Sequence, residues 1–155
     1  MRTQVFLIGI IVVLLGIAFT PNAMADTANK TKIVLLAEQT SQDEVADVVL
    51  QELNAPAGTT LRTLLPAKAE EVRQEPAKAS ELGYSHILYV RVRYTSSRRG
   101  EYILHQAHLS LRLFEVSSEE IVKSWTHRGV GFDQISALEL ASERAANILE
   151  ELKEE

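Results

Sequence analysis

The sequence contains no cysteine. A chain without cysteine forms no disulfide bond, has no thiolate to hold a metal ion or attack a substrate, and cannot be lipid-modified on an N-terminal cysteine. Positive charge is also scarce: 16 Lys and Arg residues against 21 Asp and Glu residues give a net charge of −5. Because nucleic-acid binding requires Lys and Arg to neutralise phosphates, this balance argues against a general nucleic-acid-binding function.

Catalytic and nucleotide-binding motifs are missing as well. No serine stands in a Gly-x-Ser-x-Gly elbow, and there is neither a phosphate-binding glycine loop nor a His-Glu-x-x-His zinc motif. Adjacent acidic pairs such as Glu70-Glu71 and Glu119-Glu120 stand on predicted helices or turns. Sequence neighbours diverge on a helix, so these pairs do not form an acid–base couple. We therefore predict a chain that is not an enzyme and that has no cofactor.

What the sequence does contain is, first, a long uncharged run at its N-terminus. Residues 5–19 are rich in Ile, Val and Leu, and they follow a positively charged start. Residues 23–25 read Ala-Met-Ala, the small-x-small pattern that precedes signal-peptidase cleavage. We predict a signal peptide over residues 1–25, cleavage between Ala25 and Asp26, and export to a bacterial periplasm without stable membrane insertion afterwards. The alternative is an uncleaved segment that anchors the protein in the inner membrane.

The first part of the remaining chain alternates between strand and helix patterns. Residues 32–38 include a continuous apolar run that is typical of a strand buried on both faces. A capping box at residues 41–44 predicts the start of an amphipathic helix, and residues 59–65 form a second strand candidate. Residues 67–82 have a helical composition, but Pro76 is expected to kink or split that helix because proline lacks a backbone N–H.

From residue 84 onward the apolar residues recur with a period of two, which is typical of strands with one buried face. The first of these strands is expected to end in a polar turn at residues 95–100, and a second turn is expected at residues 117–120. Residues 121–128, closed by Gly129 and Gly131, form the third strand. The residues predicted to face the core in the first two strands are Tyr84, His86, Leu88, Val90, Val92, Tyr94, Ile103, His105, Ala107, Leu109, Leu111 and Leu113.

A final helix is predicted to begin near Asp133 or Ser136, with a capping box formed by Ser136 and Glu139. Its apolar stripe runs without interruption from Ile135 to Leu152, which is typical of one long helix packed on a core.

The whole order of elements is β-α-β-α-β-β-β-α. Because helices must cross between the early strands while the later strands form a meander, this order predicts an α/β (α+β) fold in which helices cover a mixed sheet. We place this single domain at residues 31–152. A short N-terminal tail at residues 26–30 precedes it, and a frayed acidic tail at residues 153–155 follows it.

Two segments resemble a family of bacterial envelope domains. Residues 79–90, Ala-Ser-Glu-Leu-Gly-Tyr-Ser-His-Ile-Leu-Tyr-Val, are similar to the helix end and strand of that family. Residues 109–125, which end at the only tryptophan, are similar to its strand, short turn and second strand. The family includes the periplasmic domain of the curli-secretion channel lipoprotein, the lipoprotein activator of penicillin-binding proteins, and the N-terminal domain of TolB.

The resemblance implies a non-enzymatic envelope domain that binds another protein. Two departures limit what it implies. Family members often have glycine where Ser118 stands and soon after the start of the first long strand, where this chain has Val90 and Arg91. Several members are lipid-anchored, which a chain without cysteine cannot be, so membrane tethering, pore formation and activator function are not carried over.

The four histidines raise a metal-binding alternative. His105 and His108 are three residues apart, which places their side chains on opposite faces of a strand, so that one ion cannot bind both. We predict that His105 is a structural residue, hydrogen-bonded at the edge of the core. His86, His105 and His127 remain open as ligands in a second hypothesis, that of a periplasmic protein that binds a metal or a small ligand.

A cluster of arginines is the strongest candidate for a binding site. Residues 91, 93 and 99 share strand parity, and the hairpin is expected to project the cluster together. Arginine pairs with carboxylates and phosphates, so we predict a docking patch for an envelope protein, with an anionic lipid head group or a wall polymer as other ligands. The alternative is that the charges only protect the hairpin from edge-to-edge aggregation. The cluster and its neighbouring tyrosines are Arg91, Arg93, Arg98, Arg99, Tyr94 and Tyr102.

Overall fold

A computed structural model describes residues 31–37, 42–56, 58–146 and 148–153. The predicted signal peptide at residues 1–25, its cleavage site between Ala25 and Asp26, and the tail at residues 26–30 lie outside the described residues.

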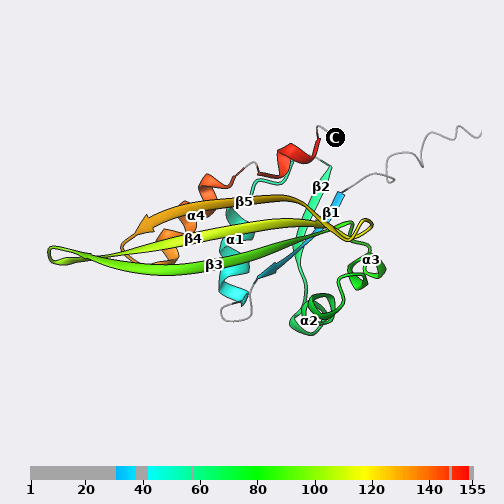
Figure 1. The fold of residues 1–155 in the computed structure, drawn as a ribbon, viewed down its shortest axis with the longest axis horizontal. Helices are drawn as coiled ribbons and strands as arrows, with labels where there is room; N and C mark the ends of the chain where they lie inside the picture. The colour runs from blue at the N-terminus through cyan, green and yellow to red at the C-terminus, as the bar shows by residue number, and fades with distance from the viewer. Residues whose placement is uncertain (1–30, 38–41, 57, 147, 154–155) are drawn as a thin grey trace, which may run out of the picture.

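Five strands and several helices follow one another in the predicted order (Figure 1). The elements are β1 (Thr31–Ala37), α1 (Gln42–Glu52), β2 (Thr59–Thr63), α2 (Pro66–Gln74), α3 (Lys78–Glu81), β3 (His86–Arg99), β4 (Tyr102–Glu115), β5 (Glu120–Gly131), α4 (Gln134–Arg144) and the 3₁₀ helix η2 (Ile148–Lys153). The strands form one mixed sheet in the order β2-β1-β3-β4-β5. Strand β1 pairs in parallel with β2 and β3, whereas β3, β4 and β5 form an antiparallel meander. The predicted fold class is confirmed.

The helix predicted over residues 67–82 is divided at Pro76, as expected. Helix α2 starts with Pro66 in its first turn, where a missing N–H costs nothing, and it ends before Pro76. The short helix α3 follows, and Gly83 then takes a left-handed backbone conformation with φ of +81°.

The turn predicted at residues 95–100 is wrong. Strand β3 continues through Arg99, which pairs with Tyr102, so only Gly100 and Glu101 form the turn. Gly100 has a φ of +62°, a conformation that glycine adopts without steric cost. The polar residues before it suit a turn by composition, but here the hydrogen-bonded pairing with β4 keeps them extended. Strand β5 likewise continues past its predicted end, through Gly129 and Gly131.

The last helix also differs from its prediction. The N-cap is Asp133, whose carboxylate accepts a 2.8 Å hydrogen bond from the backbone N–H of Ser136, in place of a box formed by Ser136 and Glu139. Helix α4 ends at Arg144 with Ala145 as its C-cap, and the apolar residues from Ile148 onward belong to η2. Ile135, at the start of the predicted stripe, is 46% exposed, because it lies before the part of α4 that packs on the sheet.

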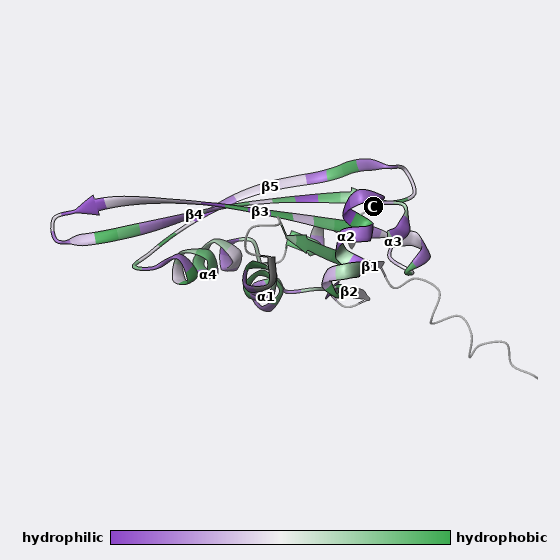
Figure 2. Cartoon of the chain, turned by 90° about the horizontal axis from the view of Figure 1, so that it is seen from below, coloured by the Kyte–Doolittle hydropathy of each residue, from purple (hydrophilic) through white to green (hydrophobic). Residues whose placement is uncertain are grey.

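One face of the sheet is covered along much of its length by α1, α4 and η2 (Figures 1 and 2). We call it the covered face. Its core contains alternate residues of β3 and β4 and the apolar side of α4: Leu88, Val90, Ala107, Leu109, Leu111, Leu113, Leu138 and Ala141. Val92 and Tyr94 pack against this core as predicted, but Ile103 is 55% exposed because it lies beyond the helices.

The opposite face, which we call the open face, is covered at one end only. There α2 and α3 pack through Val72 and Ala79 on a smaller core that includes Val34, Leu36 and Ile87. Tyr84 packs against this second core, so its predicted place beside Leu88 is wrong. Tyr84 precedes β3, and strand parity therefore does not fix its side.

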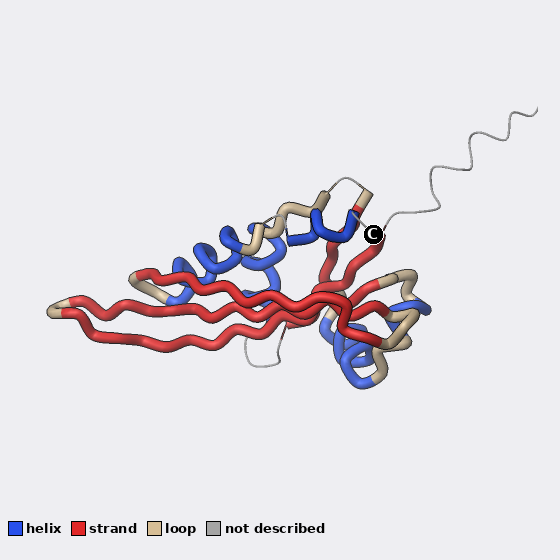
Figure 3. The backbone as a smooth tube through the Cα atoms, turned by 45° about the horizontal axis from the view of Figure 1, so that its top comes forward, coloured by secondary structure: helices blue, strands red, loops and turns tan. Residues whose placement is uncertain are grey.

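The meander extends far beyond the rest of the sheet (Figure 3). Strand β1 pairs with β3 only as far as Val90, whereas β3 continues to Arg99 with β4 as its partner. We call this extension the arm; the cross-strand pairing bounds it as residues 91–110 and 126–131. The arm is the setting of the predicted binding residues.

Candidate functional site

The predicted arginine cluster is divided by the geometry of β3. Arg91, Arg93 and Arg99 share the open face, as their parity predicts, and Arg98 lies on the other side. An extended strand rises about 3.3 Å per residue, so Arg99 lies about 26 Å along the strand from Arg91. The expectation that the hairpin projects all four guanidinium groups together is therefore wrong, because the predicted turn is strand.

The two tyrosines of the predicted patch are also separated. Tyr94 packs against the core of the covered face, and burial raises the pKa of its hydroxyl, with the nearby Glu44 acting in the same direction. Tyr102 is 66% exposed at the far end of the arm, opposite Arg99. Tyr94 is thus a packing residue, and Tyr102 belongs with the tip of the arm.

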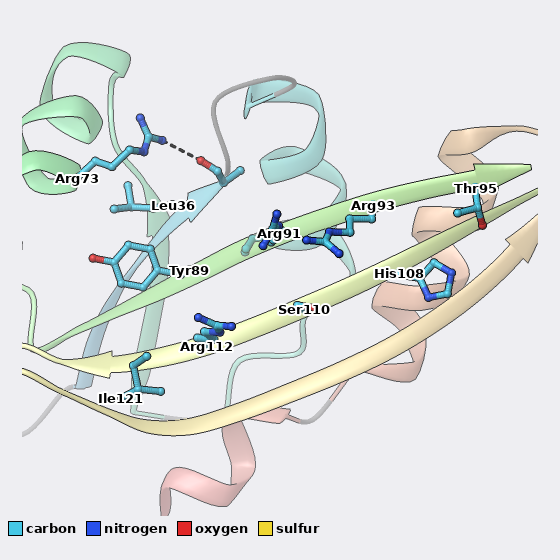
Figure 4. Close-up of a pocket in the computed structure, with 12 residues that line it drawn as sticks. Leu36, Arg73, Tyr89, Arg91, Arg93, Thr95, His108, Ser110, Arg112 and Ile121 are labelled. Atoms are coloured by element: carbon cyan, nitrogen blue, oxygen red, sulfur yellow. Dashed lines mark hydrogen bonds between the residues drawn. The ribbon is translucent and has the colours of Figure 1, made fainter.

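Arg91 and Arg93 line a cavity of about 860 Å³ on the open face, between α2 and the start of the arm (Figure 4). Arg73 from α2, and His108 and Arg112 from β4, line it too. We call this the arginine cavity. Among the described residues that line it there are four arginines and one histidine but no aspartate or glutamate. Sequence reasoning placed His108 and Arg112 away from the core but did not connect them with Arg91 and Arg93.

The pairing of β3 with β4 explains this convergence. Arg93 lies directly opposite His108, and Ser110 lies opposite Arg91. Arg112 lies opposite Tyr89, one diagonal step from Arg91. Direct cross-strand neighbours have Cβ atoms about 5 Å apart, and diagonal neighbours have them about 7–8 Å apart. Long arginine side chains from these positions can reach a common ligand.

Arg73 is held in place by two hydrogen bonds. Its guanidinium donates to Glu70 Oε2 at 2.8 Å and to the carbonyl oxygen of Ala37 at 2.8 Å, the contact drawn in Figure 4. The second bond ties α2 to the end of β1. Beside it, burial raises the pKa of the Tyr89 hydroxyl, while the positive charge of Arg73 acts in the opposite direction. This end of the cavity is therefore the fixed and partly apolar end, with Tyr89, Leu36 and Ile121 in its wall.

The tip of the arm carries a separate patch. Tyr102 and Phe132 are 66% and 74% exposed, and their rings meet edge to face with centroids 6.4 Å apart. Arg99 lies across the strand pair from Tyr102, whereas the exposed Ile103 lies opposite Arg98 on the other side of the strands. We call these residues, with Arg98, the tip patch. The sequence prediction included its arginines and Tyr102, but it assigned Ile103 to the core and did not consider Phe132.

The histidines do not form a cluster. The strand pairing places His86 opposite Glu115, His105 opposite Ser96, and His127 opposite Leu109. His105 and His108 lie on opposite faces, as predicted. Among the described residues, no group of three or more His, Asp or Glu side chains is placed to hold a metal ion.

Within the part of the chain that the structure describes, no helix combines the length and apolarity needed to cross a membrane.

Comparisons with known proteins give the fold. No protein-family model and no curated protein sequence matches the chain. The PelC dodecamer from Paraburkholderia phytofirmans is a solved structure similar to it, with a TM-score of 0.52 and 16% identity over 76% of this chain and 88% of that one.

Two further solved structures are more distant. TolB from Acinetobacter baumannii has a TM-score of 0.38 and 12% identity, covering 68% of this chain and 24% of TolB. The LpoB C-terminal domain from Salmonella enterica also has a TM-score of 0.38, with 14% identity over 66% and 83% of the two chains. The likeness to PelC shows a shared α/β fold and no more than that.

Proposed function

We propose that this chain is an exported, periplasmic and non-catalytic module that binds another protein in a bacterial envelope complex. The observation that carries the proposal is the tip patch, in which Tyr102, Ile103 and Phe132 are all more than half exposed at the end of the arm. Large aromatic side chains with arginines beside them are the residue types that dominate protein–protein interfaces. The rings of Tyr102 and Phe132 are in contact and form one exposed apolar surface, whereas Ile103 faces the other side of the strand. Exposed apolar surface of this kind on a small domain is typical of an interaction site.

The fold is consistent with this function. PelC, which has the same fold, is a dodecamer, so the fold allows association through its surface. The end of the β3–β4 hairpin, which carries Arg99 and Tyr102, extends beyond α1 and α4 (Figures 1 and 2), and Phe132 lies in the connection between β5 and α4 with its ring exposed. The exposed guanidinium groups of Arg98 and Arg99 would steer and orient a partner with an acidic surface.

Crosslinking in intact cells tests the proposal. A tagged chain is crosslinked, captured from the envelope fraction, and analysed by mass spectrometry, in the natural form and as the double variant Tyr102→Ser/Phe132→Ser. We expect the natural chain to retain one stoichiometric partner, either another envelope protein or a second copy, and the variant to lose most of it.

Two further variants separate apolar from charged contributions. Arg98→Glu/Arg99→Glu should also abolish capture, whereas Arg62→Glu, an exposed arginine on β2, should not. Leu65→Ser is the matched control for the tip variant, because Leu65 is 78% exposed but lies before α2. Capture that persists in both tip variants, with their circular dichroism spectra unchanged, would rule out the tip patch as the binding surface.

A further inference from the structure

The arginine cavity concentrates positive charge in a chain whose net charge is −5. Four arginines converge there without an aspartate or glutamate among the described lining residues. The strand register places Ser110 opposite Arg91, His108 opposite Arg93 and Tyr89 opposite Arg112, so no lining arginine lies directly opposite another and their long side chains can share one ligand. Arg73 is paired with Glu70 at 2.8 Å, and the arginines from β3 and β4 bring further N–H donors to the same cavity, which suits an anionic ligand.

Protection of an exposed strand edge does not account for the cavity. Edge protection explains charges on β3, which has no neighbour on one side along the arm. Arg112 lies on β4, which is paired with β3 on one side and β5 on the other. Arg73 comes from a helix and is held toward the cavity by the carbonyl oxygen of Ala37. Protection of a strand edge therefore does not explain Arg73 and Arg112.

The donors suit phosphate better than carboxylate. A carboxylate presents two oxygens, whereas a phosphate group presents three and carries a charge of about −1.5 to −2. Each guanidinium brings up to five N–H donors in a planar fork. Ser110 and Thr95 add hydroxyl groups to the lining. The number of donors around one cavity therefore exceeds what a single carboxylate can accept.

The surroundings favour a soluble ligand over a lipid. Next to the cavity the open face continues with Ser97, Gln106 and Thr126, which are polar; the exposed rings of Tyr102 and Phe132 lie farther along the arm, where Tyr102 pairs with Arg99. Ile121 is the one large apolar side chain in the described lining that is more than half exposed, so the cavity itself offers little apolar surface to a bilayer. Its side chain and the ring of Tyr89 can instead cover the uncharged body of a small ligand at the fixed end of the cavity.

We propose that the arginine cavity binds a soluble ligand that carries two or more phosphate groups. A volume of about 860 Å³ accommodates a ligand of the size of a small phosphorylated metabolite. Arg91 and Arg112 hold one phosphate from neighbouring strands, and Arg93 with His108 holds the other. This site is separate from the tip patch, so the phosphate-binding proposal can be tested independently of the protein-binding function proposed above.

Calorimetric titration of the purified exported protein with inorganic pyrophosphate tests the proposal. We expect saturable one-to-one binding, weakened about tenfold or more in Arg91→Gln/Arg112→Gln. The matched control is Arg62→Gln/Arg98→Gln, which removes the same charge from exposed arginines outside the cavity and should change the affinity less than about twofold. The variant Arg93→Gln/Arg112→Gln provides a second test if the first does not fold. Tyr102→Ser/Phe132→Ser should bind pyrophosphate like the natural chain.

Three results would overturn the proposal. The first is the absence of saturable pyrophosphate binding up to about 10 mM, because an interaction weaker than this does not indicate a specific site. The second is an equal loss of affinity in the control variant, which would make the attraction non-specific. The third is binding only to a different source of negative charge: vesicles that contain phosphatidylglycerol would indicate a lipid surface, and polyglutamate would indicate an acidic protein segment.

Discussion

The two faces of the sheet are built from the same strands but have different tasks. On β4, Leu109, Leu111 and Leu113 are fully buried under the helices of the covered face. The alternate residues Ser110 and Arg112 line the arginine cavity on the open face. One face of a strand can therefore stabilise the fold while the other carries charges that no core would accept. The difference depends on which helices cover which part of the sheet.

The coverage is unequal because the helices on the two faces differ in position. Helices α1 and α4 contact each other and cover the centre of one face. Helices α2 and α3 are short and polar, and they cover only the end near Ile87 and Val116. Helices α2 and α3 therefore leave the open face of the arm uncovered, and this face presents polar residues such as Arg93 and His108 together with Tyr102 at its end.

The largest effect is expected from a side chain added under α4. A Cβ atom at Gly129 would lie 2.0 Å from the carbonyl oxygen of Ala137, so Gly129→Val must push the helix off the sheet. We expect a loss of about 4 kcal/mol or more in the free energy of unfolding, measured by urea denaturation. Thr126→Val, on the exposed open face of the same strand, should change it by less than about 0.5 kcal/mol. If Gly129→Val and Thr126→Val lower the free energy of unfolding equally, the two faces of the sheet do not differ in packing as described.

Neighbouring residues of β4 give the next test. Leu111→Ala removes a fully buried side chain from the covered face and should cost about 3 kcal/mol of unfolding free energy. Arg112→Ala removes an exposed side chain from the open face and should leave stability within about 0.5 kcal/mol of the natural value. A stabilising effect of Arg112→Ala would sharpen the comparison, since it would show that the clustered arginines repel one another.

A smaller gain is expected inside the covered face. The hydroxyl of Ser142 on α4 is fully buried and, among the described groups, has no hydrogen-bond partner. Ser142→Ala removes an unsatisfied polar atom and improves helix propensity, so it should raise the free energy of unfolding by about 1 kcal/mol. Ser142→Thr keeps the hydroxyl and adds a methyl group to a packed site, and it should destabilise. Loss of stability in the alanine variant would mean that the hydroxyl is satisfied in solution.

The smallest effect concerns pH. Burial lowers the pKa of His86 below its ordinary 6.5, partly offset by Glu115, so the folded chain binds a proton less readily than the unfolded chain. The contribution of His86 to stability is thus present above pH 6.5 and is lost as pH falls through 6.5 toward the folded-state pKa. In His86→Gln the free energy of unfolding should fall less between pH 7.5 and 5.5, about the span of a histidine titration. If the free energy of unfolding depends on pH in the same way in His86→Gln and in the natural chain, the imidazole of His86 is solvated in the folded state.

Local patterns predicted much of the fold. The two-residue period of β3 and β4 assigned Leu88, Leu109 and Leu111 to the core, and each is fully buried. Pro76 divided its helix because it lacks an N–H in any surroundings. The predicted turn at residues 95–100 failed because composition competes there with a long-range partner strand, and the pairing with residues 102–107 outweighs it.

The candidate site shows the same division. Strand parity predicted that Arg91 and Arg93 share a face, and they do. Because Arg98 and Arg99 are close to Arg91 and Arg93 in sequence, we predicted one cluster; the extended strand β3 instead places Arg98 and Arg99 at the far end of the arm. The partners that did join, Arg73 and Arg112, are distant in sequence and are brought close by the position of α2 and by the β3–β4 register.

By itself the sequence determined which side of each strand is apolar, where proline breaks a helix, and that the chain forms strands and helices in this order, because these depend on neighbouring residues. Only the tertiary structure decided that the meander outgrows the sheet, that α2 and α3 stop short of the arm, and that four arginines share one cavity. Those outcomes depend on non-local packing. The free energy of such packing is set by which surfaces meet, and the period of a single segment does not contain that information.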